Sequence, residues 1–204
     1  MNMRNVNIVA RYESKLLRRD IVFLGFVVIA LVGISLWQMI KQGRVNVFWY
    51  KVALPSSFPF FSMYYYNLVQ VLIALFVCME VVYRERKKDA MEVFLCRPFR
   101  NSEYCIGRFL GIFRMFLFVN ICVLLVCMYI NLWVVGAPFN VWIYVFYLFT
   151  LSIPTLIFVL GCALSISAMV KNRPLSVLVL GLFGLGVYFY LDEWQFGANL
   201  KFAG

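Results

Sequence analysis

Long runs of uncharged, mostly apolar residues alternate with short charged segments along this chain. Four runs contain no Asp, Glu, Lys or Arg: residues 21–40, 52–79, 115–170 and 174–191. A helix needs about 20 apolar residues to cross the ~30 Å hydrocarbon core of a bilayer. The run over 115–170 is too long for one span and suits two spans joined by a turn. The pattern therefore predicts five membrane spans.

The runs lack the period-2 alternation of half-buried strands, and lipid offers no partner for unpaired backbone groups. We therefore expect an all-α fold, a polytopic transmembrane helix bundle that forms a single domain over residues 1–204. The expected spans are 21–40, 63–83, 104–135, 141–170 and 174–191.

Two spans carry residues that predict local features. Pro154 is the expected kink of the fourth span, with Ser152 and Thr155 near the backbone groups that a proline frees. The fifth span contains three glycines that suit close helix packing. These are Gly181, Gly184 and Gly186.

The residues before the first run, 3–19, predict a basic amphipathic helix. Its apolar positions recur at spacings of three and four, and basic residues fill much of the rest. The membrane-interface residues expected in this helix are Val6, Val9, Tyr12, Leu16, Arg18 and Arg19. Because the helix leads straight into a span, we expect it to lie in the membrane interface. A cytosolic helical tail without lipid contact is the alternative.

Composition and charge agree with a membrane protein. The chain is 64% hydrophobic and 14% charged, and its net charge is +10. The N-terminal tail, the segment 84–114 and the turn at 171–173 carry fifteen Lys and Arg on one side, against four on the other. The bias of Lys and Arg toward cytosolic loops predicts a cytosolic N-terminus. The expected location is a bacterial plasma (inner) membrane. The same bias also accounts for the basic charge without nucleic-acid binding.

The cysteines and the missing histidines give no sign of a reactive centre. The chain has six cysteines and no histidine, and no C-x-x-C pair occurs. None of the cysteines falls in a loop expected outside the cell, so a disulfide framework is not expected. We expect no catalytic residue, metal ligand or cofactor site of the chain's own.

The segment between the second and third spans is the most charged part of the chain. Asp89 can cap a short helix over 89–96, with Glu92 three residues later, and Pro98 ends it. About two helical turns are marginal in isolation, so this helix needs a packing partner. Its apolar face could pack on the membrane domain or in lipid, or dock on a soluble partner.

The order of these elements, together with one motif, resembles the membrane permease subunits of ATP-binding-cassette (ABC) transporters of the type-2 exporter class. The motif reads E-R-x-x-D-A-M-E-V-F-L-x-x-P-x-x-N-x-E-Y-x-x-G-R over 85–108. Asp89 and Ala90 stand where that class usually has Gly and Thr. Such permeases have six spans, so the resemblance implies a chain without the sixth.

The resemblance also implies roles for particular segments. Residues 89–96 would be the coupling helix that seats on an ABC ATPase subunit, and 3–19 the elbow helix. A second permease subunit, identical or different, would complete the transporter. The residues expected at the ATPase contact are Glu85, Arg86, Asp89, Met91, Glu92, Phe94, Leu95, Arg97 and Pro98.

Three functions remain open from the sequence. A transporter subunit would depend on a separate ATPase, because the chain has no G-x-x-x-x-G-K-[ST] phosphate loop. An integral-membrane enzyme would need clustered acids or an activated nucleophile, and residues 115–170 hold no charged side chain. A non-transporting membrane scaffold is the third possibility.

Overall fold

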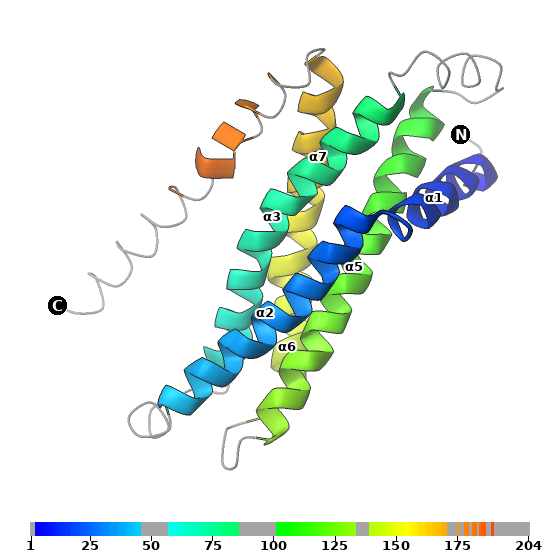
Figure 1. Ribbon diagram of the computed structural model, residues 1–204. Coiled ribbons are helices and arrows are strands. Elements are labelled where there is room, and N and C mark those ends of the chain that lie inside the picture. The colour runs from blue at the N-terminus through cyan, green and yellow to red at the C-terminus, as the bar shows by residue number, and fades with distance from the viewer. Residues whose placement is uncertain are drawn as a thin grey trace. The chain divides into compact units, whose positions relative to one another are not determined.

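The computed structural model describes residues 3–45, 57–85, 101–133 and 139–170, together with scattered positions between 175 and 189. Every element in these described ranges is a helix (Figure 1). They are α1 (Met3–Leu17), α2 (Ile21–Val45), α3 (Ser57–Glu85), α5 (Asn101–Trp133), α6 (Val141–Tyr147), the π-helical segment η1 (Leu148–Ser152) and α7 (Ile153–Met169). The expected all-α class is confirmed.

Three stretches are long and apolar enough to cross a membrane: Pro59–Tyr83, Asn101–Trp133 and Val141–Met169. A fourth is possible if α1 and the helix that follows it count as one broken span. These stretches correspond to the expected spans 63–83, 104–135, 141–170 and 21–40. The structure describes only scattered positions of the expected fifth span, 174–191, so the count of five stays a prediction.

The chain divides into two compact units. The first comprises Met1–Val69 and Arg97–Phe158, and the second comprises Gln70–Cys96 and Val159–Gly204. The first unit contains α1, α2 and α5, and most of the contacts described below lie within it.

A sharp turn separates α1 from α2. The two helices meet at 72°, with Arg18, Arg19 and Asp20 between them. The Asp20 carboxylate accepts a hydrogen bond from the Val22 backbone N–H at 2.9 Å. Such a contact satisfies one of the free N–H groups at a helix start, so Asp20 caps α2.

Three phenylalanines hold α2 against α5 just beyond that turn. Phe23 and Phe26 of α2 and Phe116 of α5 are all buried. The rings of Phe23 and Phe116 meet edge to face, with centroids 5.4 Å apart. Edge-to-face aromatic pairs stabilise a contact beyond the area they bury. The start of α2 is therefore anchored to the middle of α5.

The helix that begins at Val141 widens into a π-helical turn before Pro154. Asn140 caps the start, since its side-chain oxygen accepts from the Trp142 backbone N–H at 3.0 Å. The segment Leu148–Ser152 is π-helical. The Thr155 hydroxyl donates to the Leu151 carbonyl at 2.6 Å. The helix is therefore irregular just before Pro154, while the kink expected at Pro154 itself stays a prediction. Ser152 bonds to Asn67 of α3.

In the second unit, Gly184 lies against α3. A Cβ added at Gly184 would lie 3.2 Å from Leu75 Cδ1 and 3.4 Å from Leu72 Cδ2. Gly181 and Gly186, which were expected to pack in the same way, have no atom within 4 Å of such a Cβ. Only one of the three glycines therefore makes the expected close approach in the described structure.

Candidate functional site

The first three turns of α5 are packed closely against α1. They begin at Asn101, directly after the charged segment 86–100, and carry Gly107 and Gly111 four residues apart. Positions four apart on a helix share one face. Helix α1 lies across that face (Figure 1). We call the contact the α1–α5 interface.

Both glycines are required by the distance between the two helices. A Cβ at Gly107 would lie 2.8 Å from the Val6 carbonyl oxygen and 2.8 Å from Val9 Cβ. A Cβ at Gly111 would lie 2.8 Å from the Ala10 carbonyl oxygen. Two of these neighbours are backbone atoms, which cannot swing aside. Small residues spaced as Gly-x-x-x-Gly allow such backbone approaches between helices.

Hydrogen bonds fix the register of the interface. Near its beginning, Asn5 Nδ2 donates to Glu103 Oε2 at 3.0 Å. Farther along, the Ser14 hydroxyl lies 3.0 Å from the Gly111 carbonyl oxygen and 2.8 Å from that of Ala10. Contacts therefore advance together along both helices, so α1 and α5 run in the same sense.

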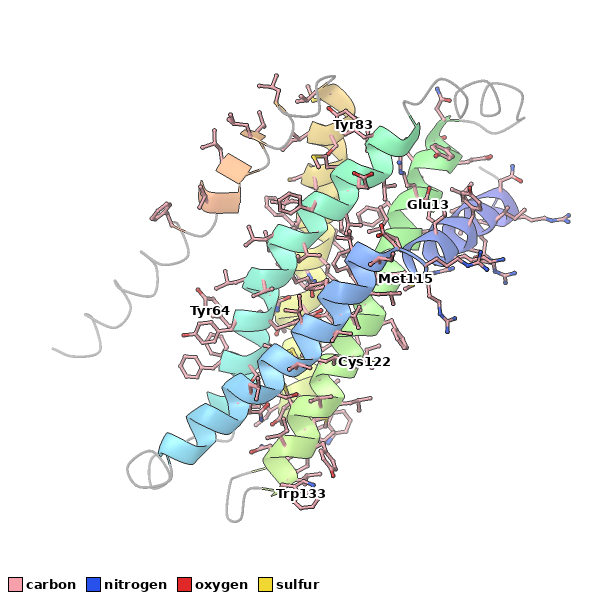
Figure 2. The ribbon with its side chains drawn as sticks, in the orientation of Figure 1. Glu13, Tyr64, Tyr83, Met115, Cys122 and Trp133 are labelled. Carbon is pink, nitrogen blue, oxygen red and sulfur yellow. The ribbon has the colours of Figure 1, made fainter. Side chains whose placement is uncertain are left out.

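Three charged side chains are buried at or beside this interface. Glu13 of α1 is 2% exposed, and Glu103 and Arg108 of α5 are 4% and 7% exposed. Charged groups are almost never this buried unless they are paired. The Arg108 guanidinium carbon lies 5.9 Å from the centre of the Tyr104 ring. A Cβ added at Gly111 would lie 2.8 Å from the Cβ of Glu13, which is labelled in Figure 2.

The expected membrane-interface residues of α1 lie in different surroundings. Val6 and Val9 are buried against α5, whereas Tyr12 is 55% exposed. Leu16 is half-buried, and Arg18 and Arg19 are exposed in the turn that follows. The buried residues of α1 are Val6, Val9, Ala10, Glu13 and Leu17.

The opposite side of α1 is basic. Its exposed residues include Arg4, Arg11 and Lys15, with Ile8 and Tyr12 between them. One face of α1 is therefore packed against α5. Its other face is basic and partly apolar, and α5 does not cover it. A lipid interface for that second face stays a prediction.

The expected ATPase-contact residues fall almost entirely outside the described structure. Glu85 is the last residue of α3, and nothing is described of its side chain. The other eight, Arg86, Asp89, Met91, Glu92, Phe94, Leu95, Arg97 and Pro98, lie in the segment that is not described. The coupling helix at 89–96 therefore stays a prediction.

Sequence reasoning missed the α1–α5 interface. The signal that could have found it is the spacing Gly107-x-x-x-Gly111, of which only Gly107 belongs to the permease-like motif. In the described ranges, no group of three His, Cys, Asp or Glu side chains is placed to hold a metal ion.

No family model, curated protein or solved structure matches the chain.

Proposed function

We propose that this chain is the membrane-spanning subunit of an ABC transporter in a bacterial plasma membrane. Its N-terminus would be cytosolic, and a separate ABC ATPase subunit would bind and hydrolyse ATP. A second permease subunit would complete the assembly. One observation carries the proposal: the charged segment 86–100 leads directly into the turns of α5 on which α1 is packed.

That arrangement suits the transmission of a movement. A force applied to 89–96 by an ATPase subunit would act on the beginning of α5, because only residues 97–100 intervene. Gly107 and Gly111 hold α1 against α5, and Phe116 holds α2. The displacement would therefore reach α1, α2 and α5 together. Packed helices of this kind shift between discrete arrangements instead of deforming continuously.

The proposed ATPase contact combines an apolar anchor with a charged rim. Met91, Phe94 and Leu95 would share one face of the coupling helix and enter a groove of the ATPase. Most of the binding energy of such a contact comes from a few buried apolar side chains. The surrounding charges would steer the encounter and set its dependence on salt. They are Glu85, Arg86, Asp89, Glu92 and Arg97, and Pro98 would end the helix.

The test is an ATPase assay on reconstituted membranes. The full chain is co-expressed with the ABC ATPase encoded nearest to it, purified and placed in proteoliposomes. We expect ATP hydrolysis by the pair to exceed that of the ATPase alone, and the chain alone to hydrolyse no ATP. A co-purifying ATPase whose rate does not depend on this chain would favour a membrane scaffold instead.

A further inference from the structure

The side of α1 that faces away from α5 carries a stripe of exposed residues. Ile8, Arg11 and Lys15 follow one another at spacings of three and four, so they share one face of the helix. At 3.6 residues per turn, this stripe lies about half a turn from Ala10 and Glu13, which are buried against α5. Figure 2 shows several nitrogen-tipped side chains that extend outward from α1.

The turn after α1 extends this stripe with two more arginines. Arg18 and Arg19 are both exposed. Tyr12, next to Arg11 on the helix, is 55% exposed. We call these exposed residues together the basic face, which consists of Ile8, Arg11, Tyr12, Lys15, Arg18 and Arg19.

The acids of the same stretch leave the basic face positive. Residues 1–20 contain five Lys and Arg and two acids, Glu13 and Asp20. Glu13 is 2% exposed and lies on the opposite side of the helix. The Asp20 carboxylate accepts a hydrogen bond from the Val22 N–H at the start of α2. The basic face therefore presents a net positive charge to whatever covers it.

The basic face lies at the level where two helices lose their charges. The uncharged run 21–40 begins directly after Asp20, and the uncharged run 115–170 begins directly after Arg114. Arg114 NH1 donates to Asn7 Oδ1 at 3.2 Å, so α1 lies beside the last charged turn of α5. Because hydrocarbon excludes charge, these two boundaries mark the edge of the bilayer core. Helix α1 is therefore at the depth of the lipid headgroups.

The direction of α1 and its apolar neighbours suit a membrane surface. Helices α1 and α2 meet at 72°, so an α2 that crosses the bilayer near its normal leaves α1 close to the membrane plane. Ile21 and Val22, directly after the basic turn, are 85% and 67% exposed. Ile8 is 51% exposed between the cations. These side chains suit the boundary between headgroups and acyl chains, whereas a soluble acidic partner would leave Ile21 and Val22 in water.

We propose that the basic face of α1 binds the headgroups of anionic phospholipids and selects them over zwitterionic ones. The arginines can each donate two parallel hydrogen bonds to a phosphate, and Lys15 supplies a compact positive charge. A phosphocholine headgroup places its own cation beside the phosphate, which the basic face repels. A phosphatidylglycerol headgroup carries no such cation. This inference goes beyond the proposed function, because it concerns the lipid around the chain and does not depend on an ATPase.

The test is electron paramagnetic resonance of spin-labelled lipids in phosphatidylcholine bilayers that contain the full chain. Phosphatidylglycerol and phosphatidylcholine, labelled at the same acyl-chain position, are compared by the fraction of each that the protein immobilises. We expect the wild type to prefer phosphatidylglycerol about twofold or more, averaged over all its lipid contacts, since each basic residue near an anionic surface favours binding. The preference should fall at high salt, because these side chains are exposed and their charges are screened.

Two variants assign the preference to the basic face. Arg11→Gln, Lys15→Gln, Arg18→Gln and Arg19→Gln, made together, remove four charges from exposed positions and should bring the two lipids to nearly equal affinity. The matched control, Arg11→Lys with Arg18→Lys and Arg19→Lys, keeps every charge and should retain most of the preference. If the fourfold variant is not reconstituted, Arg11→Gln with Lys15→Gln takes its place and should lose about half of the preference.

Three results would overturn the proposal. The first is a wild type without a preference for phosphatidylglycerol. The second is an equal preference in the wild type and the glutamine variant. The third is an equal loss in the glutamine and lysine variants, since charge would then not decide the selection. Loss of a co-purified protein from the glutamine variant, with its lipid preference unchanged, would assign the basic face to a protein contact instead.

Discussion

At the scale of single residues, the missing side chains of Gly107 and Gly111 decide how α1 packs. Any side chain there would meet the backbone of α1, namely the carbonyl oxygens of Val6 and Ala10. The glycines of α2 differ, because a Cβ at Gly25 would meet nothing within 4 Å. Gly107 and Gly25 therefore provide a matched pair of positions for testing the α1–α5 interface.

We expect Gly107→Ala to destabilise the chain by about 1–3 kcal/mol, as overpacking of a close contact does. Gly25→Ala should be neutral or slightly stabilising, since alanine favours a helix by up to about 1 kcal/mol over glycine. Unfolding of the purified chain by SDS, followed by circular dichroism, measures both. Equal stability of the two variants would contradict the close approach of α1 to α5.

The hydrogen bond between Asn67 and Ser152 joins α3 to η1, and a double-mutant cycle can measure it. We expect Asn67→Ala and Ser152→Ala to show a coupling energy of about 0.5–1.5 kcal/mol, the net contribution of one such bond. Asn67→Ala with Ser35→Ala is the control pair, whose effects should add. Additivity in both pairs would show that the Asn67–Ser152 bond is not formed in the membrane.

At the scale of elements, the sequence predicted the positions of three long apolar helices well. The expected spans 63–83, 104–135 and 141–170 agree with Pro59–Tyr83, Asn101–Trp133 and Val141–Met169 to within a few residues. The agreement has a physical reason, because hydrocarbon excludes charge and the uncharged runs mark the spans. Pro59 could extend the second span backward, since a proline is tolerated in the first turn of a helix.

The rotational setting of α1 could not be predicted in the same way. Its buried side is centred on Ala10 and Glu13, whereas its apolar residues also include Tyr12 and Leu16. Hydrophobicity alone would not predict a glutamate, Glu13, at the centre of the buried side of α1. The rotation of α1 about its axis is set by the space over Gly107 and Gly111, which lie on a helix almost one hundred residues away in the sequence. Sequence periodicity within α1 carries no information about that space.

If α1 and α5 move as one body, joining them covalently should not impair coupling to an ATPase. Asn7 and Arg114 are exposed, and Arg114 NH1 donates to Asn7 Oδ1 at 3.2 Å. We therefore predict that Asn7→Cys with Arg114→Cys, made in a chain without its native cysteines and joined by a short bis-maleimide, retains full stimulation of the ATPase. The uncross-linked double variant is the control. Loss of stimulation only after cross-linking would mean that α1 slides on α5 during the cycle.

At the scale of the whole molecule, the proposed function requires one orientation of the chain in the membrane. The distribution of Lys and Arg predicts that the N-terminus and the segment 86–100 lie in the cytosol. Ser102 at the start of α5 and Val141 at the start of α6 would then lie on opposite sides. Both side chains are exposed, so each can report its side.

We predict that, in a cysteine-free chain, Val141→Cys reacts with a membrane-impermeant maleimide in intact cells whose outer membrane has been permeabilised. Ser102→Cys should react only after the inner membrane is opened. Both variants should react equally with a permeant maleimide, which controls for access. The reverse labelling pattern would place segment 86–100 outside the cell, where no ATPase could reach it.

The central claim is that a cytosolic ABC ATPase binds this chain at residues 89–96. Quantitative co-purification tests this claim most directly. The full chain is purified from native membranes, and the recovered protein that carries a G-x-x-x-x-G-K-[ST] loop is measured by mass spectrometry. Phe94→Ala should weaken docking by about 1–3 kcal/mol, the effect of truncating a buried anchor, which raises the Kd about 5- to 150-fold and lowers recovery. Leu95→Ala should act similarly, Arg97→Ala should have a smaller and salt-dependent effect, and Gly25→Ala should have none. Full recovery of the ATPase with both Phe94→Ala and Leu95→Ala, at equal membrane insertion, would contradict the account.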